Sequence, residues 1–183
     1  LMVNIKTGAK RVLRYGPYKK DFYRTLLVEG NRLSTSATVI RHDFLVQHDL
    51  SFRELQDYVT VEDYDLWLNL ARTSARFKFI NEVLGEYVIH DANSSAWLSR
   101  HWKNSETLLH DHVFKIQQFH PFPERLWKQI SPRFRLVQVP QLAASGQLGL
   151  ALKLALETLI SSPIGTMKCL LSRLKKLIRD MKL

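Results

Sequence analysis

The sequence Thr60-Val61-Glu62-Asp63-Tyr64-Asp65-Leu66-Trp67-Leu68 joins a cluster of acidic residues directly to an apolar helical pattern. Tyr64, Trp67 and Leu68 lie at i, i+3 and i+4, and Ala71 follows at i+7, so these side chains share one helical face. The pattern predicts a helix that is anchored in the core and carries acidic groups at its N-terminus. A carboxylate held at the end of a fixed element is suited to act as a general base.

On spacing alone, a purely structural interpretation of these acidic residues comes first. Thr60 and Asp63 are three residues apart, as in a capping box, and the helix dipole favours acidic groups in a first turn. Asp63-Tyr64-Asp65 has the spacing of a D-x-D metal–diphosphate motif. Nearby side chains diverge around a helix, however, so this short pattern does not predict a metal site.

Three segments resemble, in the same order, the C-terminal half of the catalytic domain of family 2 glycosyltransferases, which are of the GT-A type. They are Gly30–Arg41, Val61–Ala71 and Glu82–His90, the last followed by Asn93-Ser94-Ser95. The middle segment looks like the family's Glu-Asp motif, in which the Asp is the catalytic base. It departs from the family at Asn69, where a basic residue is more usual. Leu50-Ser51-Phe52 stands where the family often has Gly-Gly-Phe.

The resemblance implies an α/β fold: a partial GT-A domain, the acceptor-side half, over residues 1–120, with an α-helical tail over 121–183. It implies inverting transfer of a sugar from a nucleotide-sugar to a hydroxyl of a glycan or lipid-linked acceptor. Asp63 would be the general base, with Glu62 beside it to modify its pKa. The resemblance also assigns residues that would hold the sugars, Asn31, Thr35, Ser36 and Trp67, and one that would help hold a divalent ion, Mn²⁺ or Mg²⁺, namely His90.

Local patterns predict the elements around this motif. β-rich runs predict strands at Ala37–Ile40, Phe77–Ile80 and Glu86–His90. Apolar periodicity predicts helices over about 96–118 and 142–160, and a last helix that follows Pro163.

The nucleotide-binding strands and the D-x-D motif of the family's N-terminal half have no counterpart in this sequence. Residues 1–28 are instead basic and aromatic-rich, with Asp21 as their one acid before Glu29. We therefore expect this chain to lack the donor-binding half of a transferase and to be inactive alone. A truncated product, a cropped piece and one half of a split enzyme all fit this pattern.

The chain of 183 residues carries 27 Lys and Arg against 17 Asp and Glu, a formal charge of +10. This charge favours anionic partners. Nucleic acid is not expected, because no RNA-binding signature accompanies the basic and aromatic residues of 1–28. The alternative to an enzyme is a non-catalytic basic module that binds an anionic membrane or nucleic acid, in which the acidic cluster only caps a helix.

Residues 164–183 predict a basic amphipathic helix, with an apolar stripe flanked by six Lys and Arg residues. Such a helix suits an anionic membrane surface, and packing on its own domain or on a partner helix would bury the same stripe. No run of 18 apolar residues exists, and Cys169 is the one cysteine, which suits a reducing compartment. We expect a cytoplasmic protein, peripheral on the inner face of the plasma membrane.

Overall fold

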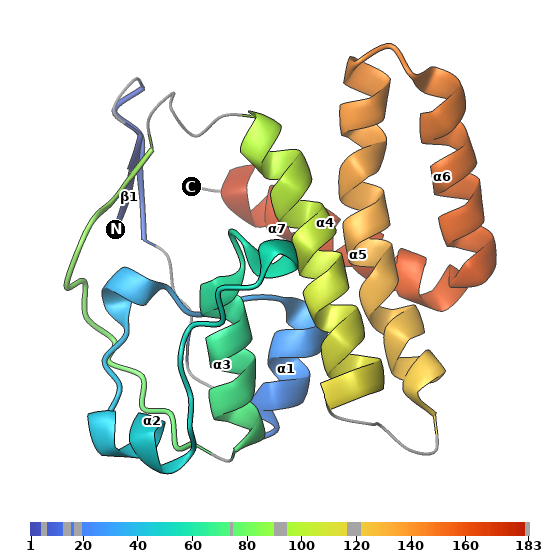
Figure 1. Cartoon of the computed structure of the whole chain (residues 1–183). Coiled ribbons are helices and arrows are strands. Elements are labelled where there is room, and N and C mark those ends of the chain that lie inside the picture. The colour runs from blue at the N-terminus through green and yellow to red at the C-terminus, as the bar shows by residue number, and fades with distance from the viewer. Residues whose placement is uncertain are drawn as a thin grey trace. The chain divides into compact units, whose positions relative to one another are not determined.

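The computed structural model describes residues 1–4, 7–12, 16, 20–73, 75–89, 95–116 and 122–181 (Figure 1). The chain forms two compact units, Leu1–Leu108 and Leu109–Leu183, which we call the N-terminal unit and the C-terminal unit. Their boundary lies within a long helix, whereas the sequence pattern placed a boundary after residue 120.

The N-terminal unit combines short helices with a small sheet. Its elements are β1 (Met2–Asn4), β2 (Lys10–Arg11), α1 (Phe22–Glu29), η1 (Thr35–Ala37), α2 (His42–Gln47), η2 (Gln56–Tyr58), α3 (Glu62–Arg72), β3 (Tyr87–Ile89) and most of α4 (Ser95–Asp111). The sheet has the order β2-β1-β3. β1 pairs antiparallel with β2, with Met2 opposite Arg11, and parallel with β3, with Met2 opposite Tyr87.

The predicted α/β fold of a partial GT-A domain is wrong. The described residues are mostly helical, and each strand of the sheet has only two or three residues. β3 lies within one predicted strand, but the strands predicted at Ala37–Ile40 and Phe77–Ile80 do not form, and Val39 is 100% exposed. A strand is stabilised by its pairing with a neighbour. In the described part of the chain these two runs have no neighbouring strand, so their β propensity alone does not produce a sheet.

The predicted anchored helix is confirmed as α3. Tyr64, Trp67 and Leu68 are all buried, as their spacing requires. The Tyr64 hydroxyl donates a hydrogen bond of 2.5 Å to the carbonyl oxygen of Leu26, which lies on α1. Helices α1 and α3 pack side by side (Figure 1). The start of α3 is therefore fixed by the core beneath it.

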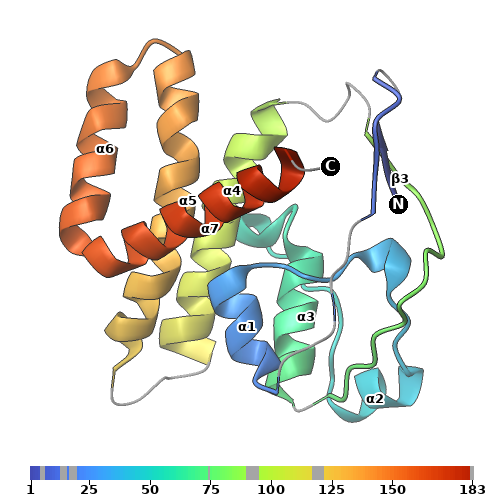
Figure 2. The ribbon, with the colours of Figure 1, turned by 180° about the vertical axis from the view of Figure 1, so that it is seen from behind.

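The C-terminal unit is helical throughout its described part. After the end of α4 it contains η3 (His112–Ile116), α5 (Pro123–Ala144), α6 (Leu148–Ser161) and α7 (Pro163–Met181). α5 packs against both α6 and α7 (Figure 2). The helix predicted over 142–160 is interrupted, because Gly146 adopts φ +80° in the turn between α5 and α6. The predicted last helix with Pro163 in its first turn is confirmed as α7.

The start of α7 packs tightly on α5, and two glycines test this packing. A Cβ on Gly165 would lie 2.4 Å from the Ser162 Oγ and 2.5 Å from the Lys128 carbonyl oxygen, whereas a Cβ on Gly149 in α6 meets nothing within 4 Å. We expect Gly165→Ala to lower the free energy of unfolding by about 2 kcal/mol through overpacking. The matched control Gly149→Ala should raise it by roughly 0.5–1 kcal/mol through helix propensity. Urea denaturation measures both, and equal effects would contradict the packing.

Candidate functional site

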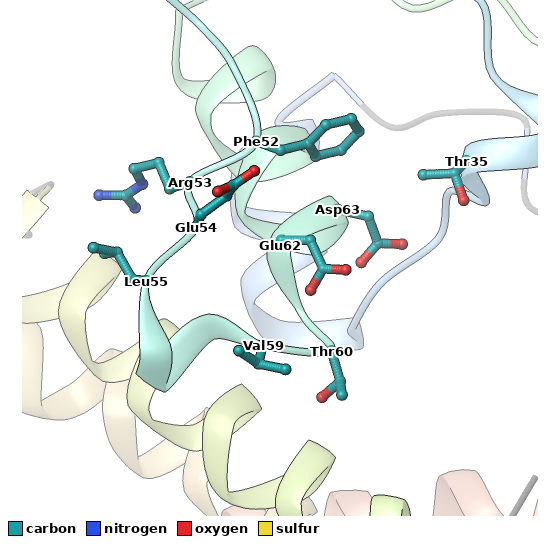
Figure 3. Close-up of a pocket in the computed structure, with 9 residues that line it drawn as sticks. All are labelled: Thr35, Phe52, Arg53, Glu54, Leu55, Val59, Thr60, Glu62 and Asp63. Carbon is teal, nitrogen blue, oxygen red and sulfur yellow. The ribbon is translucent and has the colours of Figure 1, made fainter.

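A cavity of about 580 Å³ opens beside the N-terminus of α3. Three segments line it: Thr35 of η1, the loop Phe52–Leu55, and the turn that leads into α3. The turn contributes Val59, Thr60, Glu62 and Asp63. Figure 3 shows the carboxylates of Glu62 and Asp63 directed into the open space between α3 and Thr35. The cavity therefore brings together the predicted base, its acidic neighbour and one predicted sugar-binding hydroxyl.

Asp63 is held in place mainly by its neighbour on the helix. Its Oδ1 accepts a hydrogen bond of 2.6 Å from the Tyr64 backbone N–H. The predicted capping box is wrong, because the N-cap residue of α3 is Val61 and no side chain caps this terminus. The Asp63 carboxylate therefore satisfies one first-turn amide of α3, and its remaining acceptor positions can face the cavity.

Burial is the main influence on the charge of Asp63, and it raises the pKa of this carboxyl above its ordinary value. The Tyr64 N–H opposes this rise, and the negative charge of Glu62 adds to it. Smaller effects of His101 and of a hydrogen bond with the Asn31 side chain lower the pKa again. The net result is a carboxylate that binds a proton more readily than a free aspartate, which is the direction a general base requires.

Arg53 and Asp65 tie the cavity loop to the helix. Arg53 Nε donates to Asp65 Oδ2 at 2.6 Å and Nη2 donates to Oδ1 at 2.5 Å, while Asp65 is completely buried. The Arg53 guanidinium also lies 4.9 Å from the centre of the Tyr58 ring. Asn69 Nδ2 donates to the backbone oxygen and to Oδ1 of Asp65, at 3.0 and 3.2 Å. The neutral amide of Asn69 thus completes the buried network.

The turn before α3 is strained and is held by α4. Thr60 adopts φ +77°, a left-handed conformation that is costly for a β-branched residue. Its carbonyl oxygen lies 3.1 Å from His101 Nδ1, and the Val59 carbonyl accepts a hydrogen bond of 2.8 Å from Asn104 Nδ2. The buried Thr60 Oγ1 has no hydrogen-bond partner among the described residues. Strain of this kind at a cavity wall is typical of functional sites.

Glycine at position 60 tests the strain directly. We expect Thr60→Gly to raise the free energy of unfolding by about 1 kcal/mol, because glycine adopts positive φ without steric cost and the unpartnered hydroxyl is removed. Thr38, at φ −127°, provides the control, and Thr38→Gly should destabilise the protein. Thermal denaturation of the two variants measures the difference. A loss of stability in Thr60→Gly would show that position 60 is not strained.

The other predicted site residues that the structure describes do not line the cavity. Asn31 contacts Asp63 but does not line the cavity. The exposed Ser36 Oγ pairs with Ser34 Oγ at 3.1 Å and also lies off the cavity wall. Trp67 is only 2% exposed and packs in the core, so the structure does not bring it to the cavity. His90 lies outside the described residues.

Sequence reasoning missed the residues that hold the site together. Asp65 gave one usable signal, because it shares the buried face of Leu68 and Asn69, and a buried carboxylate requires a cation or several donors. Nothing in the sequence identified Arg53 as that cation, twelve residues away. The sequence did not identify His101 and Asn104 as part of the site either, although their i, i+3 spacing places both on one side of α4.

The predicted metal ligand His90 is outside the part of the chain that the structure describes. In the ranges that the structure describes, no group of three or more His, Cys, Asp or Glu side chains could hold a metal ion. The acidic residues at the cavity therefore do not by themselves fit a divalent ion, and we derive no step through one. No protein-family model, curated protein or solved structure matches this chain. The chemistry of the site must be argued from its residues.

Proposed function

We propose that this chain supplies the acceptor side of an inverting glycosyltransferase, with Asp63 as its general base. The observation that carries the proposal is the half-buried Asp63 carboxyl, with its raised pKa, on the wall of a cavity of about 580 Å³. The resemblance of the segment Val61–Ala71 to the family's Glu-Asp motif supports the same role for Asp63. The proposal concerns activity and does not depend on a GT-A fold.

The proposed reaction is one displacement at the anomeric carbon of the donor sugar. The acceptor hydroxyl oxygen forms the new bond to this carbon, and its proton passes to the Asp63 carboxylate. The bond from the anomeric carbon to the diphosphate breaks, and the nucleoside diphosphate leaves with the electron pair. Attack opposite to the leaving group inverts the configuration. Binding of the nucleotide-sugar is assigned to a companion segment, since this sequence shows no diphosphate motif.

The lining of the cavity favours an uncharged acceptor. Glu54, Glu62 and Asp63 contribute three acidic groups. Among the described residues of the lining, Arg53 is the one basic group; it is paired with the buried Asp65, and Figure 3 shows its guanidinium directed away from the other side chains. Carboxylates accept hydrogen bonds from sugar hydroxyls and repel phosphates or uronates. Phe52, 48% exposed, offers an aromatic face for the apolar side of a sugar ring.

A titration with simple sugars tests the acceptor site in this chain. We expect methyl glucoside to perturb the amide signals of residues 52–63 in an NMR titration, whereas glucuronate should bind at least about threefold more weakly because of charge repulsion. Phe52→Ala should abolish the perturbation. Phe122→Ala is the matched control, since Phe122 is 49% exposed and lies outside the cavity. Equal binding of the two sugars, or binding unchanged by Phe52→Ala, would contradict an acceptor site here.

A further inference from the structure

The surface of α6 and α7 is unusually apolar for an exposed surface. Eleven large apolar side chains on these two helices are between 47% and 79% exposed, with Leu152 at 66%, Ile160 at 79% and Ile164 at 72%. We call this surface the α6–α7 apolar surface. Many exposed apolar side chains on neighbouring helices mark an interaction site.

The C-terminal unit also carries most of the chain's net charge. Residues 109–183 hold 12 of the 27 Lys and Arg residues but only 4 of the 17 Asp and Glu residues, so their formal charge is +8 of the total +10. Basic residues occur on the same helices as the apolar surface, and Lys153, Lys168 and Arg173 are exposed. The surface therefore combines exposed apolar groups with a strong positive field.

The polar groups at the α6–α7 bend are already satisfied within the unit. Thr158 Oγ1 donates to the Leu154 carbonyl at 2.6 Å, and Thr166 Oγ1 donates to the Thr158 carbonyl at 3.1 Å. The Ser162 hydroxyl donates to the Lys128 carbonyl at 2.5 Å. A hydroxyl bonded to a backbone carbonyl can enter an apolar medium without leaving an unpaired polar group. These hydroxyls are buried within the C-terminal unit, so the side chains that the bend leaves exposed include the apolar Ile160 and Ile164.

The length and composition of α6 and α7 are compatible with contact with a lipid membrane. No single helix of the described residues is long and apolar enough to cross a membrane. By length and composition alone, α6 and α7 as far as Leu174 are together long and apolar enough, with a bend of 115° between them. A helix pair with this bend, charged residues along its sides and its apolar tip at the bend is suited to lie in a membrane interface.

We propose that the α6–α7 apolar surface inserts into the interface of an anionic lipid membrane, with the exposed Ile160 and Ile164 beside the bend entering first. The exposed Lys168 then lies near the anionic headgroups. A second copy of this chain is disfavoured as the occupant, because pairing the same surface would bring two segments of charge +8 together. Membrane binding by this surface does not involve Asp63, so its test is independent of the proposed transferase activity.

Vesicle flotation of the full chain tests the proposal. We expect the chain to float with phosphatidylglycerol-containing vesicles at least about tenfold more than with pure phosphatidylcholine, and the bound fraction to fall as salt rises. The double variant Ile160→Asp, Ile164→Asp should reduce binding to anionic vesicles about tenfold, because it places charges in the apolar tip. Circular dichroism checks that the variant keeps its helical content.

A matched double variant controls for the added charge. Val46→Asp with Leu84→Asp alters side chains of similar exposure, 67% and 74%, in the N-terminal unit, and should leave flotation unchanged. Salt-independent binding to neutral vesicles would overturn the role of charge. Absence of vesicle binding together with a dimer, detected by light scattering and lost in Ile160→Asp, Ile164→Asp, would assign the surface to a second copy and overturn the proposal.

Discussion

Asp63→Asn is expected to reduce kcat of the proposed sugar transfer by about a hundredfold or more, the usual contribution of a general base. The amide still accepts the hydrogen bond that the Tyr64 N–H donates to Asp63 Oδ1. It cannot, however, take the proton of the acceptor hydroxyl. Release of the nucleoside diphosphate in the proposed reaction measures the effect. Near-normal turnover in this variant would end the assignment of Asp63 as the base.

Two neighbouring acids provide controls for this substitution. Asp57, which is exposed on η2 and does not line the cavity, should tolerate Asp57→Asn without loss of turnover. Glu62→Gln removes a negative charge that raises the pKa of Asp63. The acid limb of the pH profile of kcat/KM should therefore move to lower pH, with a smaller loss of activity than in Asp63→Asn. An unchanged acid limb in Glu62→Gln would show that Glu62 does not act through Asp63.

Asp63→Asn should also stabilise the fold. The direction of this change in the free energy of unfolding follows from the raised pKa of the Asp63 carboxyl. Burial raises the pKa of Asp63 in the folded state, so the folded state binds more protons than the unfolded state between the two pKa values. The contribution of this group to the free energy of unfolding therefore falls as pH rises through that window. Asp63→Asn removes the ionised group and should raise the melting temperature at neutral pH but not at pH 3. Function and stability would then oppose each other at this position.

Arg53→Ala is expected to lower the free energy of unfolding by about 3 kcal/mol, the lower end of the range for removing one partner of a buried ion pair. The substitution leaves the Asp65 carboxylate, which is 0% exposed, without its bidentate cation. The lower end applies because the Arg53 side chain keeps 37% exposure. The loop 52–55 should also lose its attachment to α3, so sugar binding at the cavity should weaken in the same variant. Urea denaturation measures the stability.

The exposed pair of Arg41 and Asp43 is the matched control for the buried pair. Both side chains of this pair are largely exposed, 83% and 69%, so solvent screens their attraction and Arg41→Ala should produce no measurable change. A double-mutant cycle with Arg53→Ala and Asp65→Asn then isolates the coupling between the two buried partners. A stability loss in Arg53→Ala no larger than that in Arg41→Ala would show that the bidentate contact contributes nothing.

The sequence by itself determined the helix α3 and the last helix α7. Their side-chain periods are local properties of the chain, and one turn of helix fixes which positions share a face. It also determined that Glu62 and Asp63 stand at the start of an anchored helix, because the apolar positions that follow them leave only one way to bury that helix. The basic character of residues 164–183 was equally readable.

Only the tertiary structure decided the sheet and the surroundings of Asp63. The runs Ala37–Ile40 and Phe77–Ile80 have strand composition, but a strand needs a partner from elsewhere in the chain, and in the described part neither run has one. Three features of the site depend on residues from different segments of the chain. They are the contact of Arg53 with Asp65, the positive φ of Thr60, and the burial that raises the pKa of Asp63. Composition and spacing do not encode such contacts, because packing and desolvation arise only when the elements meet.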